Sequence, residues 1–255
     1  PPRSALPHAF ALHTTSLNMP QIRRALNFLL DVDGTLIHTD ALYFKVFQKL
    51  LQPFGYDVDD AFYKANVHGK VDADVFSKLM PETYGPTELL DMSKKKDALF
   101  CELYREHVAA HGPPMITGLG EALGRAKALG VRCIAVTNAP RGAAEASMKS
   151  LRDTIPAADI IEGLVIGAEC EHAKPYPDPY LEGMRILGVN APECVVFEDS
   201  RSGVRAGIAA GVPVVGISSA LSEQQLAELG CVASLPDWNA LDDALLAQWM
   251  SGDGL

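Results

Sequence analysis

The sequence predicts an α/β fold, a doubly wound parallel sheet with an all-helical domain inserted near its N-terminal end. Three observations predict it. Several short apolar runs are continuous rather than alternating, which is typical of strands covered on both faces. Helical periodicity fills the segments between them, and strands that alternate with helices favour a parallel sheet. One interval between two runs is much too long for a single crossover helix.

The four strand-like runs are rich in β-branched residues, and each ends on polar residues. They are ALNFLLD (25–31), VRCIAVT (131–137), CVVFED (194–199) and VPVVGIS (212–218). Open α/β sheets bind ligands outside the carboxyl ends of their strands. The strand-ending residues Asp31, Thr137 and Asp199 are therefore expected at one edge of the sheet.

Helices are predicted between these runs. The segment 119–130 carries apolar residues on one helical face, with Gly130 placed to end the helix. Segments 175–188 and 202–211 are predicted as two further helices. Gly203 and Gly207 lie four residues apart in the last of these, a spacing that favours close packing of the helix on the sheet.

The interval between Asp31 and Thr137 contains the inserted domain. Thr137 lies 106 positions after Asp31, whereas a strand–helix–strand unit takes about 30 residues, so about seventy are surplus. The surplus shows three apolar helical stripes: Tyr43, Val46, Phe47, Leu50 and Leu51; Val75, Phe76, Leu79 and Met80; and Leu99, Phe100 and Leu103. Asp72 is expected as the N-cap of the second helix, and Lys94, Lys95 and Lys96 as the solvated face of the third.

These patterns divide the 255 residues into three parts. Residues 1–20 are predicted to be a flexible N-terminal extension, residues 21–38 and 113–250 the core domain, and residues 39–112 the helical cap domain. The first thirty residues contain no Asp or Glu and only three arginines. A disordered extension is the favoured interpretation, and an organellar targeting segment is the alternative.

Composition excludes several classes of function. The formal net charge of −10 argues against broad nucleic-acid binding, which requires clustered Lys and Arg. No apolar stretch approaches the roughly 18 residues of a membrane span. The five cysteines are odd in number and have no C-x-x-C spacing, so neither a disulfide framework nor a zinc site is indicated. We therefore expect a cytoplasmic protein, either a monomer or a dimer, that binds neither nucleic acid nor membrane.

Four short motifs follow the predicted strands and loops in a fixed order: DVDGTL (31–36), VTN (136–138), KPYPDPY (174–180) and FEDSRSG (197–203). Asp-Gly alone is also a hairpin signal. A calcium loop counted from Asp31 is excluded, because Leu36 and Leu42 stand where it needs Gly and Glu.

Together the four motifs resemble the haloacid dehalogenase superfamily, in its phosphatase-rich branch with a helical cap, which includes β-phosphoglucomutase-like proteins. Dehalogenases typically replace the second aspartate, and Asp33 is retained here, which argues against carbon–halogen cleavage.

The resemblance implies a role for each motif residue in phosphoryl transfer. Asp31 is expected to attack phosphorus and form an aspartyl-phosphate. Asp33 is expected to protonate the leaving alkoxide and then to take a proton from water. Thr137, with the backbone N–H of Asn138, is expected to bind phosphoryl oxygens, and Lys174 to add positive charge at the nucleophile and the phosphate.

A metal ion is part of the same expectation. A carboxylate and a phosphate repel each other, so the reaction needs a hard cation between them, and carboxylate and phosphate oxygens suit Mg²⁺. The resemblance implies Asp31, Asp199 and the backbone carbonyl of Asp33 as Mg²⁺ ligands. Glu198 is expected to act through water or from behind these ligands.

The substrate is expected to be a small phosphorylated metabolite, such as a sugar, polyol or nucleotide-type monophosphate. His68, Gly69 and Lys70 are possible substrate contacts from a cap loop. Two alternatives stay open: a phosphomutase of the β-phosphoglucomutase type, and a catalytically silent binding protein. Where mutase-like relatives have a cap arginine and a histidine, this chain has Asp72 and Tyr43, which favours water as the acceptor. Lys70 as a substitute cation keeps the mutase alternative open.

Overall fold

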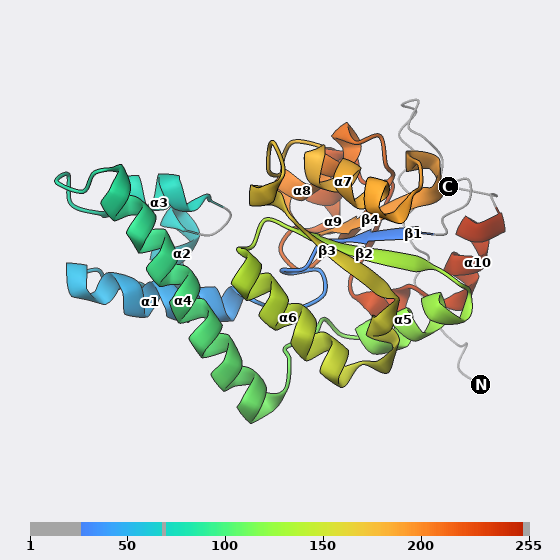
Figure 1. Cartoon of the computed structure of the whole chain (residues 1–255), viewed down its shortest axis with the longest axis horizontal. Helices are drawn as coiled ribbons and strands as arrows, with labels where there is room; N and C mark the ends of the chain where they lie inside the picture. The colour runs from blue at the N-terminus through green and yellow to red at the C-terminus, as the bar shows by residue number, and fades with distance from the viewer. Residues whose placement is uncertain (1–26, 68–69, 252–255) are drawn as a thin grey trace, which may run out of the picture.

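A computed structural model describes residues 27–67 and 70–251 of the chain. Its centre is a parallel sheet of six strands in the order β3-β2-β1-β4-β5-β6 (Figure 1). The strands are β1 (Asn27–Leu30), β2 (Arg132–Thr137), β3 (Ile161–Ile166), β4 (Cys194–Glu198), β5 (Val214–Ile217) and β6 (Ala233–Leu235). Within the described ranges, no helix is both long and apolar enough to cross a membrane.

Helices cover both faces of this sheet, as the doubly wound prediction requires (Figure 1). One face carries α5 (Leu119–Ala128), α6 (Arg141–Thr154) and α10 (Asp243–Ser251). The other face carries α7 (Asp178–Leu187), α8 (Arg201–Ala209) and α9 (Glu223–Leu229). Each of the helices predicted in the core is present.

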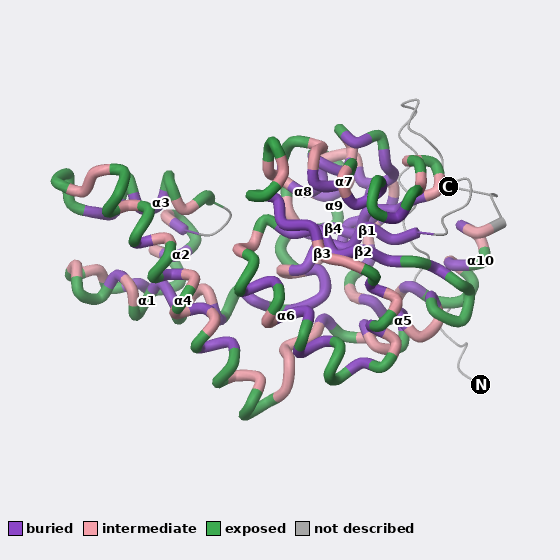
Figure 2. Tube along the Cα trace, viewed as in Figure 1, coloured by how far each residue is buried: buried purple, intermediate pink, exposed green. Residues whose placement is uncertain are grey.

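The continuous apolar runs are explained by this two-sided cover. In β1, Phe28 and Leu30 pack into the cluster that includes α5 and α6, whereas Leu29 packs into the cluster that includes α7 and α8. All three side chains are buried, and the inner strands β1, β2, β4 and β5 are buried along almost their whole length (Figure 2). A strand with an apolar layer on each side needs apolar residues at every position.

Two strands were not predicted, and both lie at edges of the sheet. The sequence of β3 contains the exposed Glu162 and the half-exposed Gly163, and β6 is only three residues long. An edge strand has a neighbour on one side only, and short edge strands carry weak apolar patterns. The signal used for the four inner runs is therefore faint in these two segments.

In the described part of the chain, four α-helices lie between β1 and α5 in sequence and stand beside the sheet rather than on its faces (Figure 1). They are α1 (Asp40–Leu51), α2 (Asp60–Asn66), α3 (Asp72–Leu79) and α4 (Pro86–His111). Their inner side chains form a hydrophobic cluster of their own, centred on Phe47 and Phe76. The three predicted stripes lie on α1, α3 and α4, and α2 was not predicted.

Two details predicted for these helices are wrong. Asp72 is the first residue of α3, and its N-cap is Val71. Lys96 is buried rather than solvated, with only 7% of its surface exposed. The buried Lys96 on α4 has a partner on another helix, because it forms an ion pair of 2.7 Å with Asp72 on α3. Helical periodicity within one segment carries no information about a partner on another helix.

The chain enters and leaves this group of helices at adjacent points. The backbone N–H of His38 donates to the carbonyl of Pro114 at 2.6 Å, and that of Ile116 donates to Leu36 at 3.0 Å. The C-terminal half of α4 also packs on α6, where the hydroxyls of Tyr104 and Ser150 are 2.5 Å apart. The four helices are thus held next to the carboxyl ends of β1, β2 and β4.

Candidate active site

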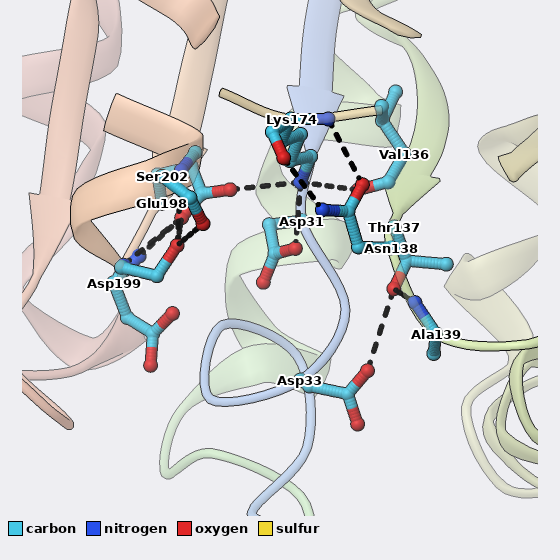
Figure 3. A network of polar contacts seen from close by, with 12 residues as sticks. Asp31, Asp33, Val136, Thr137, Asn138, Ala139, Lys174, Glu198, Asp199 and Ser202 are labelled. Atoms are coloured by element: carbon cyan, nitrogen blue, oxygen red, sulfur yellow. Dashed lines mark hydrogen bonds and ion pairs between the residues drawn. The ribbon is translucent and has the colours of Figure 1, made fainter. Parts of the chain in front are cut away.

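The carboxyl ends of three adjacent strands gather the motif residues. Asp31 follows β1 directly, and its backbone N–H donates to the carbonyl of Phe197 on β4 at 3.1 Å. Thr137 ends β2, and Asp199 follows β4. Lys174 reaches the same place from the loop before α7 (Figure 3). The strands β2, β1 and β4 are neighbours, which explains how residues far apart in sequence meet here.

Lys174 is the most completely bonded of these residues. Its ammonium group lies 2.8 Å from Asp31 Oδ1, Glu198 Oε1 and the Val136 carbonyl (Figure 3). An ammonium group has three protons, so the three acceptors match its donors. The Asn138 side chain holds the Lys174 backbone, accepting from its N–H at 3.1 Å and donating to its carbonyl at 3.0 Å. The amide of Asn138 therefore positions Lys174, a contact that the sequence did not predict.

Glu198 is fully buried and supports the loop that follows β4. Its Oε1 accepts from Lys174 and from the hydroxyl of Tyr180 at 3.0 Å. Its Oε2 accepts from the backbone N–H groups of Asp199 and Ser200 and from the Ser200 hydroxyl, each at 3.0 Å. Both carboxylate oxygens are thus already engaged, which favours a positioning role over direct binding of a metal.

Asp199 lies against Gly34, where only a glycine fits. Gly34 has φ of +82°, and a Cβ atom there would overlap the Asp199 carboxylate. Ser219 links the two, because its hydroxyl lies 3.0 Å from Asp199 Oδ2 and 2.6 Å from the Gly34 carbonyl. Ser219 was not predicted, although it follows β5 at the same edge of the sheet and the strand-end pattern could have found it.

The buried carboxyl groups form an electrostatic cluster that favours a bound cation. Burial and, to a smaller extent, the Glu198 charge raise the pKa of Asp31 to about 7 against the opposing effect of Lys174. Burial and the charges of Asp31 and Glu198 raise the pKa of Asp199. Asp31, Glu198 and Asp199 each offer a carboxylate oxygen within 4.8 Å of the others. Of these, the Asp31 and Asp199 carboxylates fit a hard divalent cation, which binds oxygen ligands and would relieve the repulsion, and Glu198 supports them from behind.

Asp33 stands apart from this cluster and is held by Thr137. Its carboxylate accepts from the Thr137 hydroxyl at 3.4 Å, and that hydroxyl accepts from the Ala139 N–H at 2.9 Å (Figure 3). Burial raises the pKa of Asp33, while the hydroxyls of Thr39 and Thr137 oppose the rise. A carboxyl group with a raised pKa is suited to proton transfer near neutral pH.

A cavity of about 620 Å³ lies between these residues and the four helices. Asp33, Lys174 and Asp199 line its core side. Its other wall is formed from α1, α2, α3 and α4 by Tyr43, Tyr63, Val67, Asp72 and Lys96. Lys70 also lines the cavity, but it is exposed and its ammonium donates to the Ala65 carbonyl. His68 and Gly69 lie outside the described residues.

Comparison with known proteins agrees with this arrangement. Residues 28–217 match the family model of the haloacid dehalogenase-like hydrolases. The chain is 30% identical to phosphoglycolate phosphatase of Rhodospirillum rubrum over 89% of its own length and 93% of that protein. It is 29% identical to hexitol phosphatase A of Escherichia coli, over 82% and 90% of the two chains. A crystal structure of CbbY from Rhodobacter sphaeroides in complex with phosphate superposes with a TM-score of 0.73 at 23% identity, covering 88% and 99%.

Proposed function

The chain belongs to the haloacid dehalogenase-like hydrolases, and from this premise we propose that it is a Mg²⁺-dependent phosphatase. It hydrolyses the phosphoric monoester of a small metabolite through an aspartyl-phosphate on Asp31. One observation carries this proposal: the buried Asp31 carboxylate is fixed by Lys174 at 2.8 Å at the edge where Asp33 and Asp199 line the cavity. Relatives named for phosphoglycolate and hexitol phosphatase activity support the monoester class.

Asp31 is the nucleophile in this proposal. One of its carboxylate oxygens forms a bond to phosphorus while the bond from phosphorus to the leaving oxygen breaks. Lys174 holds the carboxylate in one orientation through Asp31 Oδ1, and Glu198 in turn holds Lys174. A nucleophile fixed in this way loses little conformational freedom on reaching the transition state. Glu198 is accordingly a positioning residue.

Asp33 serves as the general acid and then as the general base. In its protonated form it donates a proton to the leaving alkoxide, and the resulting carboxylate takes a proton from the water that attacks the aspartyl-phosphate. Burial, which raises its pKa, supports the first step by favouring the protonated form. The Thr137 hydroxyl holds the Asp33 carboxylate on the side away from Lys174.

The carboxylates of Asp31 and Asp199, with the backbone carbonyl of Asp33, would hold Mg²⁺. When bound, the ion would neutralise the charges that otherwise keep a phosphate dianion away from a carboxylate. The Thr137 hydroxyl and the Asn138 backbone N–H would bind the phosphoryl oxygens, and Lys174 would add positive charge beside them. We assign residues 39–112 to the cap and residues 21–38 and 113–250 to the core. The wall of the cavity that α1, α2, α3 and α4 form, called the cap wall below, would then select the substrate.

Phosphate release from a panel of substrates tests the proposal. The panel contains sugar, polyol and nucleotide monophosphates, phosphoglycolate and p-nitrophenyl phosphate, each measured with Mg²⁺ and with EDTA. We expect release with Mg²⁺ from p-nitrophenyl phosphate and from at least one metabolite, and none with EDTA. Full activity after metal removal would refute the metal-dependent mechanism, and no release from any substrate would refute the phosphatase.

The phosphomutase alternative is tested separately. A mutase returns the phosphoryl group to a sugar and must keep water away from the aspartyl-phosphate. We expect hexose 1-phosphate, supplied with a catalytic amount of bisphosphate, to give inorganic phosphate or no product. Accumulation of hexose 6-phosphate without phosphate release would establish the mutase instead.

A further inference from the structure

Among the described residues, the cap wall of the cavity contains one buried cation, Lys96 on α4. Its ammonium group lies 2.7 Å from Asp72 Oδ2 and 3.0 Å from Asp97 Oδ1. Burial alone would lower the pKa of Lys96, but the two carboxylates outweigh this effect and raise its pKa. The two carboxylates beside Lys96 therefore carry more negative charge than its ammonium group carries positive charge.

This wall faces the reacting groups across the cavity. Lys96 and Asp72 line the same cavity as Asp33 and Lys174, and the charge of Lys96 acts on the Asp33 carboxyl group. Asp40 adds another carboxylate to the lining. Lys70, the other Lys or Arg that the described residues place in this wall, is exposed and donates to the Ala65 carbonyl. The part of a substrate that projects from its reacting phosphate toward Lys96 thus meets a surface with a negative balance of charge.

Resting on the proposed function, we propose that Asp72 and Asp97 make the enzyme selective for monophosphates whose remaining part is uncharged and rich in hydroxyl groups. A second phosphate or a carboxylate would be placed beside Asp72 and Asp40 with no unpaired buried cation among the described lining residues. Like charges brought together in a partly buried site disfavour binding strongly. Specificity here comes from repulsion of the wrong ligand as much as from attraction of the right one.

Hydroxyl groups suit the same wall. A carboxylate oxygen accepts a hydrogen bond from a hydroxyl, and an ammonium group with two acidic partners has a third proton to donate. Asp72 and Lys96 together can therefore receive one hydroxyl as donor and acceptor. The ring of Tyr43, 5.7 Å from the Lys96 ammonium, provides an apolar surface beside them that suits the carbon face of a sugar or polyol.

The test compares kcat/KM for sorbitol 6-phosphate and fructose 1,6-bisphosphate in the full-length protein with Mg²⁺. We expect the wild type to prefer the monophosphate by at least about tenfold. Asp72→Asn keeps the shape of the side chain and removes its charge, so this preference should fall by about tenfold, mainly through KM for the bisphosphate. Phosphoglycolate, which carries a carboxylate, should follow the bisphosphate.

Asp74→Asn is the matched control, because Asp74 is an exposed aspartate on the same helix and does not line the cavity. It should leave the preference unchanged. Asp97→Asn provides a second variant that should act in the same direction if Asp72→Asn fails to fold. A wild type that prefers the bisphosphate, or a preference unchanged in both Asp72→Asn and Asp97→Asn, would overturn the inference. If p-nitrophenyl phosphate is still hydrolysed, either of these results would contradict the selectivity but not the proposed phosphatase activity.

Discussion

At the scale of single residues, the site is governed by repulsion among buried carboxyl groups. Asp31, Glu198 and Asp199 offer oxygens within 4.8 Å of one another, and Lys174 is the cation that joins two of them. Removing a charge from such a cluster relieves repulsion, whereas removing the cation would leave buried charges without a partner. The negative charge of Asp31 is therefore needed for the reaction but lowers the stability of the fold.

Asp31→Asn should therefore remove the activity without lowering the stability of the protein. We expect phosphate release to fall about a thousandfold or more, because an amide does not attack phosphorus. Lys174 keeps Glu198 and the Val136 carbonyl as partners, so the melting temperature in EDTA should stay the same or rise. Calorimetry and a phosphate assay on one preparation measure both. Activity within tenfold of the wild type would remove Asp31 from the role of nucleophile.

Asp33→Ala should depend on the leaving group. Metabolite esters have alkoxide leaving groups that need a proton, so kcat should drop severely for them. The drop should be much smaller for p-nitrophenyl phosphate, whose leaving group needs little protonation. The ratio of the two losses is the measurement. Equal losses with both substrates would show that Asp33 is not the general acid.

At the scale of elements, the N-terminal end of α8 is fitted to the site. Ser200 accepts from the Gly203 N–H at 3.0 Å and so caps the helix, and its hydroxyl also contacts Glu198. A Cβ atom on Gly203 would overlap the Glu198 carboxylate, and one on Gly207 would lie 2.7 Å from Val214 Cγ2. The glycine spacing in this helix is thus required by its contact with β4 and β5.

Gly203→Ala should destabilise the protein by about 1–3 kcal/mol, because the added methyl group displaces a carboxylate held by five hydrogen bonds. Gly124→Ala on α5 is the control, since no atom lies within 4 Å of the added carbon. It should stabilise by about 0.5–1 kcal/mol, as alanine favours a helix. Urea unfolding gives both values, and equal effects would mean that α8 can shift away from Glu198.

At the scale of the whole molecule, the residues that would hold Mg²⁺ come from segments far apart in sequence. Asp31 follows β1 and Asp199 follows β4. An ion bound to both binds the folded chain and not the unfolded one, so it stabilises the whole core.

Mg²⁺ should raise the melting temperature of the wild type relative to EDTA. At a hundred times its Kd, a ligand of the folded state adds about 2.7 kcal/mol. Asp199→Asn should lose most of this increase while it keeps the fold. A differential scanning experiment with Mg²⁺ and EDTA measures both. An equal increase in the variant would mean that Asp199 does not hold the ion.

The sequence by itself determined the doubly wound core, three of the six helices described on its faces (α5, α7 and α8) and the candidate residues at the strand ends. These features depend on local periodicity and on motifs that remain readable one segment at a time. The tertiary structure decided what depends on partners from other segments. It paired Lys96 with Asp72, placed the Asn138 amide on Lys174 and brought Ser219 to Asp199. The sequence shows which residues are polar, but their partners are fixed only when the helices and strands pack. A buried charge is unfavourable unless a group from another segment pairs with it, so the tertiary structure decides the partner.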